Sequence, residues 1–197
     1  MKKKIFNEVK DTVKFVVIVV VSVLILQSHV VASTKVQQHS MEHTLHENDF
    51  LFAQKISYQL SSPKFGDVII FLEERPKGFW GRSIGVCIED IAQKFSNNQP
   101  RMRFVKRVIG VSGDTIDINN GKVFVNGKQL EESYIVGDTD ARNLEYPLVV
   151  PEGKLFVLGD NRTYSLDSRN FGCIDINNVE GKVLIRVWPF NKIKIIK

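Results

Sequence analysis

The longest uncharged run in the sequence is the feature that most restricts how the chain can fold. Residues 15–26 read FVVIVVVSVLIL, and the run continues without charge to Ala32. Its length of about 18 residues is enough for a helix to cross a hydrocarbon core of about 30 Å. Lipid offers the backbone no hydrogen-bond partners, so such a segment becomes helical although its β-branched residues are poor helix formers in water. The sequence therefore predicts a transmembrane anchor at residues 15–32.

The charges that flank this segment predict its orientation. One lysine, Lys35, follows it closely, whereas five precede it: Lys2, Lys3, Lys4, Lys10 and Lys14. Because cytoplasmic flanks carry the excess of positive charge, residues 1–14 are expected in the cytoplasm and residues 33–197 outside, with a single pass through the cell membrane. Two other interpretations stay open. The segment could be a cleaved secretory signal, since small residues occur at 31–33, or a buried core helix, for which a basic prefix has no use.

The composition excludes a wholly disordered chain, because 43% of the 197 residues are hydrophobic and 25% are charged. The net charge of +5 suits a neighbour of anionic lipid. Nucleic acid is the rival partner, but the body of the chain has no dense basic block and no recognition motif, so no nucleic acid is expected. The two cysteines, Cys87 and Cys173, have no metal-ligand spacing, and we expect them to be unpaired.

After residue 35 the sequence consists of short apolar runs separated by Gly and Asn, a pattern typical of β-strands. The expected strands are residues 68–71, 104–105, 123–125, 155–158 and 183–187. Asn126-Gly127 predicts a tight hairpin turn, because both residues tolerate a positive φ. The predicted fold class is therefore mainly β, with one N-terminal transmembrane helix.

One stretch, residues 72–103, departs from this β pattern and is predicted to be an insertion. Its apolar residues recur at spacings of three and four, which favours a short helix: Ile84, Ile88, Ile91 and Phe95. Such a helix could pack on the β body. It could also rest on a membrane or a partner, with Phe79-Trp80 at the interface.

A serine and a lysine need particular surroundings before they can act in catalysis. A serine hydroxyl is a weak nucleophile until a base takes its proton, and a lysine is protonated at neutral pH unless burial lowers its pKa. Lys106 lies in the apolar run 104–109, which suits such burial. Ser40 lies between His39 and His43, but adjacency in sequence does not create triad geometry. These two histidines could chelate a metal on a helix, yet no further ligand follows, so no metal is expected.

Three motifs stand in a fixed order: QHSMEHTL at 38–45, FVKRVIG at 104–110 and GDNRTYSLDSRNFG at 159–172. In this order they resemble the motifs of type I signal peptidases, the membrane-bound Ser/Lys proteases that remove signal peptides from exported proteins. A further match, GDVIIF at 66–71, corresponds to the structural motif between nucleophile and base. The resemblance covers most of the chain after residue 35. It is greatest to the single-anchor Gram-positive kind, which includes pilus-associated members, and implies a signal-peptidase-like β fold.

The resemblance implies a role for each matching residue in the first motif. Ser40 would attack the scissile carbonyl, and Met41 would help line the substrate cleft. Two positions depart from the family pattern. His43 stands where proline is usual, which removes a restraint on φ. Gln38 stands where glycine or serine is usual; relatives with serine use its hydroxyl as a second oxyanion donor, and a Gln38 amide could donate instead.

The other two motifs would supply the base and its support. By resemblance Lys106 is the general base, and Ser165 would hydrogen-bond and orient its amine. Arg107 points the other way on the same strand and is expected to be solvated. Four charged residues would brace the loop, the last two as an ion pair: Asp160, Arg162, Asp167 and Arg169.

The resemblance therefore implies a membrane-anchored serine endopeptidase that cuts preproteins after small residues, without metal or other cofactor. Its partners would be extended signal peptides, the lipid bilayer and, for a dedicated enzyme, pilin subunits. The alternative is a non-catalytic or narrowly dedicated assembly factor for surface pili with the same fold. Retention of Ser40 and Lys106 argues against loss of activity. A self-cleaving Ser/Lys repressor would share the dyad, but the chain has a membrane segment and no DNA-binding motif.

Overall fold

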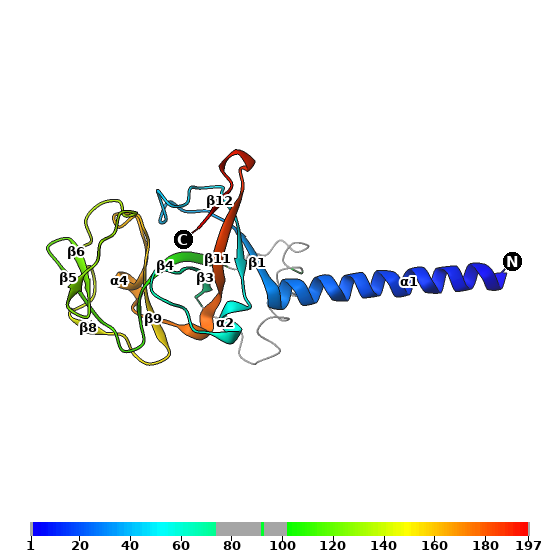
Figure 1. The fold of residues 1–197 in the computed structure, drawn as a ribbon, viewed down its shortest axis with the longest axis horizontal. Coiled ribbons are helices and arrows are strands. Elements are labelled where there is room, and N and C mark those ends of the chain that lie inside the picture. Colours follow the sequence, from blue (N-terminus) through cyan, green and yellow to red (C-terminus); the bar gives the residue numbers. More distant parts are fainter. Residues whose placement is uncertain (1, 74–91, 93–101, 197) are drawn as a thin grey trace. The chain divides into compact units, whose positions relative to one another are not determined.

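The structure, a computed structural model, describes residues 2–73, 92 and 102–196 (Figure 1). The chain divides into two compact units, residues 1–31 with 76–100 and residues 32–75 with 101–197. Most of the predicted insertion 72–103 lies outside the described residues, as do the four residues of its apolar face, Phe79-Trp80 and Cys87. Cys173 carries a free thiol.

In the first unit, the described residues before Val31 form a long helix (Figure 1). Helix α1 runs from Lys2 to Ile25 and continues as a π-helical turn over Leu26–Val30. Within Ile5–Val30 the most apolar stretch of 18 residues has a mean hydropathy of 2.3, and only 6% of that stretch is buried. The described residues cover almost none of this apolar helix, so it fits a membrane-associated protein. A secretory signal would form the same kind of helix.

The second unit is built mainly of short strands, which confirms the predicted fold class. Its helical turns are α2 (Ser57–Leu60), α4 (Ser168–Phe171), η2 (Ile176–Asn178) and η3 (Phe190–Lys192). Its strands are β1 (Val31–Lys35), β2 (Phe50–Gln54), β3 (Val68–Leu72), β4 (Arg103–Val111), β5 (Thr115–Asn119), β6 (Lys122–Val125), β7 (Lys128–Gln129), β8 (Leu148–Val149), β9 (Lys154–Leu158), β10 (Ile174–Asp175), β11 (Val179–Trp188) and β12 (Lys194–Ile195).

Among the described residues these strands form two sheets. The larger sheet has the order β1-β2-β11-β3-β4-β9-β10, with β12 paired to β11, and the smaller has the order β7-β6-β5-β8. The β5–β6 and β6–β7 hairpins turn at 120–121 and 126–127, where all four residues have positive φ. The Asn126-Gly127 turn is thus confirmed. The Asn126 side chain accepts a hydrogen bond of 2.9 Å from the N–H of Thr115, which fixes the start of β5.

Strand β4 lies in the middle of the larger sheet and carries the predicted base. It pairs with β3 through Ile69 opposite Lys106, and with β9 through Leu158 opposite Arg107. Seven consecutive residues of β4, from Phe104 to Gly110, are buried. The expectation that Arg107 is solvated is therefore wrong: it is only 3% exposed, because both faces of this strand are covered.

The hydrophobic core reaches directly under the predicted nucleophile. One buried cluster joins Met41 and Leu45 of the nucleophile motif to Leu51 of β2, Ile70 of β3 and Val105 of β4. Each of these side chains is at most 9% exposed. The loop that carries Ser40 is consequently anchored by apolar burial on the strands beside Lys106.

Candidate active site

The structure brings Ser40 and Lys106 together, although 66 residues separate them in sequence. Lys106 Nζ lies 2.6 Å from Ser40 Oγ and donates a second hydrogen bond of 3.2 Å to the carbonyl of Val105. Ser40 is 5% exposed and Lys106 is 1% exposed. Ser40 comes from the loop between β1 and β2, and Lys106 from the centre of β4. A nucleophile and a base are thus within proton-transfer distance in a buried site.

Burial gives Lys106 the properties that a base needs. Desolvation of its ammonium lowers the pKa from 10.5 to about 8, while Asp167 and Asp160 oppose this change by stabilising the positive charge. With a pKa of about 8, roughly one amine in ten is neutral at pH 7, against about one in three thousand for a lysine with the ordinary value. Only the neutral amine can accept the Ser40 proton.

The third motif holds the nucleophile loop through its main chain. The N–H of Asn161 donates to the carbonyl of Ser40 over 3.1 Å, and the Asn161 side chain donates to the carbonyl of His39 over 3.2 Å. Next to it, Thr44 Oγ1 donates to Asp160 Oδ2 over 2.5 Å. The sequence assigned no role to Asn161 itself. Its position between the matched residues Asp160 and Arg162 was the sequence feature that could have indicated this role.

The two predicted bracing residues Asp160 and Arg162 each form a buried ion pair with a residue from another segment. Asp160 accepts two hydrogen bonds from Arg107, of 2.9 and 2.8 Å, and the Arg107 guanidinium stacks 4.0 Å from the ring centroid of Tyr134. Arg162 pairs with Glu132 over 2.6 and 3.0 Å. The sequence did not indicate either partner, because both pairs depend on tertiary contacts.

The predicted pair of Asp167 and Arg169 is present, with Nε 2.9 Å from Oδ1 and both side chains fully buried. Asp167 also caps α4 and accepts the N–H of Gly159 over 3.1 Å. Burial by itself would raise the pKa of Asp167, but hydrogen bonds and charge from Arg169 outweigh it and hold that pKa below its ordinary value. The Asp167 carboxylate therefore stays ionised, and its negative charge acts to raise the pKa of the Lys106 amine.

Ser165 lies at the site but does not make the expected bond. Its hydroxyl is buried and close enough to Asp167 to help lower the pKa of that carboxyl, yet it meets the geometry of a hydrogen bond with no group in the described part of the chain. The expected bond to the Lys106 amine is therefore absent, because that amine points to Ser40 and to the carbonyl of Val105. A Cβ on Gly159 would lie 2.2 Å from Ser165 Oγ and 2.4 Å from the Ser40 carbonyl, which shows how closely these segments pack.

Gln38 and Met41 lie on the rim and floor of the site. Gln38 is exposed, and its amide makes no hydrogen bond with the residues that the structure describes. Met41 is only 1% exposed, and it borders a cavity of about 50 Å³ together with Ser40, Met102 and Val105. The small volume of this cavity favours a small side chain. Met41 therefore lies on the wall of a cavity beside the nucleophile, and its contact with substrate stays a prediction.

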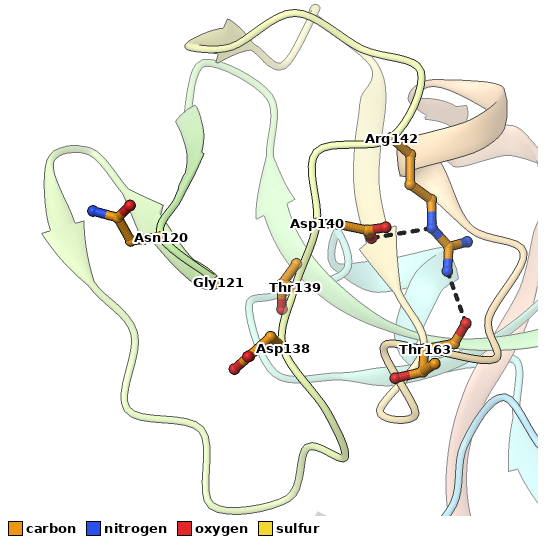
Figure 2. Close-up of a pocket in the computed structure, with 7 residues that line it drawn as sticks. All are labelled: Asn120, Gly121, Asp138, Thr139, Asp140, Arg142 and Thr163. Carbon is orange, nitrogen blue, oxygen red and sulfur yellow. Dashed lines mark hydrogen bonds and ion pairs between the residues drawn. The ribbon is translucent and has the colours of Figure 1, made fainter.

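One further arginine, Arg142, supports the third motif from outside the predicted set. Its guanidinium donates to four groups of the loop: the carbonyls of Arg162, Thr163 and Ser165 and the side chain of Asn170. Figure 2 shows it reaching Thr163 and Asp140 at the wall of a cavity of about 460 Å³. No local pattern marked Arg142, because its acceptors are mostly backbone carbonyls distant in sequence.

A membrane-type helix and a β body that buries a bonded serine and lysine are features of a membrane-associated serine peptidase. The family model described as "Signal peptidase, peptidase S26" matches residues 9–188, and the chain belongs to this family.

Individual relatives agree with this assignment. The chain is 33% identical over 183 residues to a signal peptidase I of Leptolyngbya laminosa, covering 93% of this chain and 81% of that protein. It is 30% identical over 197 residues to a signal peptidase I of Bacillus licheniformis, covering 95% and 93%. A crystal structure of a signal peptidase I from Enterococcus faecalis is 28% identical and matches with a TM-score of 0.41, over 62% of this chain and 97% of that one.

Proposed function

We propose that this protein is a membrane-anchored signal peptidase that cleaves signal peptides from exported preproteins, with Ser40 as nucleophile and Lys106 as general base. The observation that carries the proposal is the 2.6 Å contact between Lys106 Nζ and Ser40 Oγ inside a buried site. The low pKa of Lys106, about 8, supports it, because a neutral amine is then available near physiological pH.

The reaction would proceed by acyl transfer. The neutral Lys106 amine takes the hydroxyl proton as Ser40 Oγ bonds to the scissile carbonyl carbon. The tetrahedral intermediate then collapses, the C–N bond breaks, and the Lys106 ammonium returns the proton to the leaving amine. The same amine then takes a proton from a water molecule as its oxygen attacks the carbonyl carbon of the ester on Ser40. The bond between that carbon and Ser40 Oγ breaks, the Lys106 ammonium returns the proton to Oγ, and the signal peptide leaves with a new carboxyl group.

The oxyanion formed in both steps needs donors near Ser40. Within the described residues the Ser40 N–H donates no hydrogen bond, so it is available as the first donor. Gln38, two residues before the nucleophile and exposed, is proposed as the second, through its side-chain amide. Met41, on the cavity wall, would contact the small residue before the cut.

The remaining predicted residues would hold the catalytic groups in position. The buried hydroxyl of Ser165, which has no hydrogen-bond partner in the described part of the chain, would serve the Lys106 amine once that amine turns from Ser40. Four charged residues would keep the loop in place through the buried ion pairs described above: Asp160, Arg162, Asp167 and Arg169.

The proposed substrate is an extended preprotein with small residues before the cut, which the small cavity of about 50 Å³ beside Ser40 supports. The flanking lysines support an orientation with residues 1–14 in the cytoplasm, residues 15–32 as a single transmembrane anchor and the catalytic β domain, residues 33–197, outside. The alternative of a non-catalytic pilus assembly factor has no observation in its favour, since such a factor has no use for a buried serine bonded to a lysine.

The experiment compares detergent-solubilised wild type, Ser40→Ala and Lys106→Met on general and pilin-type preproteins, with each cut mapped by mass spectrometry. Ser133→Ala and Lys128→Met are matched controls, because both residues are exposed and distant in sequence from the motifs. Cleavage at the signal junction by wild type and controls, and by neither dyad variant, is the expected result. Absence of cleavage by wild type, or full activity of a dyad variant, would overturn the proposal.

A further inference from the structure

A second cavity borders the nucleophile segment. It measures about 600 Å³, and five of its lining residues matter here: His39, Glu42, Asn161, Tyr164 and Leu166. Residues 37–38 line this cavity and the small one beside Ser40, so the nucleophile segment forms a wall common to both. The other wall of the small cavity comes from the start of β4, whereas the other wall of the large one comes from residues 161–166.

The two cavities assign a direction to a bound substrate, provided that the proposed function holds. Small residues before the cut occupy the small cavity, with the scissile bond at Ser40 Oγ. An extended chain advances about 3.3 Å per residue, so the residues after the cut continue past the nucleophile along the shared wall. We infer that the large cavity receives the first two residues after the cut and selects a lysine or arginine there through Glu42.

Charge supports a basic side chain at this position. Glu42 is 29% exposed, and the His39 ring 2.7 Å from its Oε1 is its one ion-pair partner in the described chain. Its second carboxylate oxygen is available to a cation, and a carboxylate can accept two donors at once. The hydrogen bond with Glu42, its charge and the charge of Glu47 all raise the pKa of His39, so both carboxylates favour a positive charge at this rim.

Apolar contacts support a long side chain with a cationic end. Tyr164 is 76% exposed and Leu166 is 55% exposed, and both line the cavity opposite Glu42. The methylene groups of a lysine or arginine can cover these side chains while the charged end reaches the carboxylate. An arginine can in addition stack on the ring of Tyr164.

The test uses preproteins that are identical up to the cut and carry Lys, Ala or Glu at the second residue after it. The wild type is expected to cleave them in the order Lys, Ala, Glu, with kcat/KM changing about two- to fivefold at each step, the range that an exposed ion pair gives. In Glu42→Gln the Lys-to-Glu ratio should fall close to one. The ratio is taken within each enzyme, so a general change in activity does not affect it. Glu152→Gln removes an exposed carboxylate that lines neither cavity and should keep the wild-type ratio.

Cleavage of all three substrates by the wild type at equal rates, or an unchanged ratio in Glu42→Gln, would overturn the subsite and leave the proposed function standing. Failure of the wild type to cleave any of them would instead overturn the proposed function, and the subsite with it. A loss of the preference in Glu42→Gln alone would establish the selection.

Discussion

Removing the carboxylate of Asp160 should destabilise the β body strongly, because Asp160 neutralises an arginine that has no access to solvent. The side chains of Arg107 and Asp160 are 4% and 0% exposed and share two hydrogen bonds of 2.9 and 2.8 Å. In Asp160→Asn the Arg107 charge stays buried and loses the carboxylate that accepts two of its hydrogen bonds, and Thr44 loses an ionised acceptor.

The magnitude follows from the burial of this pair. Breaking one partner of a buried ion pair reduces the free energy of unfolding by about 3–5 kcal/mol. For a chain of this size each kcal/mol lowers Tm by about 2–4 °C, so Tm should fall by about 6–20 °C. Thermal unfolding of the full chain in detergent, followed by near-UV circular dichroism, measures this change.

A matched substitution separates burial from loss of charge. Asp138→Asn also removes one carboxylate, but Asp138 is exposed and has no ion-pair partner among the described residues. Its Tm should stay within about 2–4 °C of the wild type, the shift that 1 kcal/mol produces. Equal Tm values for Asp160→Asn and the wild type would refute the reasoning, because they would mean that Arg107 reaches water or another anion.

Three further outcomes follow from the geometry of the site. The wild-type kcat/KM should rise with pH and level off above a midpoint near 8, because the pKa of Lys106 is lowered to about 8 and the neutral amine is the active form. A flat profile of kcat/KM from pH 6 to 10 would contradict this. Gly159→Ala should reduce kcat/KM about 100-fold, because the added Cβ would lie 2.2 Å from Ser165 Oγ and 2.4 Å from the Ser40 carbonyl. Wild-type kinetics in this variant would show that the loops of Ser40 and Ser165 can move apart freely. Arg142→Lys should lower kcat about tenfold with little change in KM, because a lysine cannot donate to all four acceptors of the third motif. An unchanged kcat would show that the loop of the third motif holds its shape without the arginine.

The sequence predicted the features that depend on local pattern. The apolar run predicted the N-terminal helix, short apolar runs separated by Gly and Asn predicted a mainly β body, and Asn126-Gly127 predicted a hairpin turn. The three motifs predicted that Ser40 and Lys106 meet, because their order resembles a family in which they do. The structure places the two atoms 2.6 Å apart.

Features that depend on tertiary packing were not predictable in the same way. Arg107 was expected in solvent because neighbouring side chains on a strand point to opposite faces, but that argument holds only when one face of the sheet is open. Strand β4 lies between β3 and β9 with both faces covered, so Arg107 is buried on Asp160. The roles of Asn161 and Arg142 depend mainly on backbone carbonyls, which carry no residue-specific signal.

The central claim is that burial makes the amine of Lys106 a base for Ser40. NMR titration of protein labelled with 13C at lysine Cε measures this directly, with the Lys106 resonance assigned by its loss in Lys106→Met. The account predicts a midpoint near 8 for Lys106, clearly below the 10.5 of an ordinary lysine. A Lys106 midpoint at 10.5 together with the surface lysines would contradict it, because the amine would then remain protonated and unable to activate Ser40.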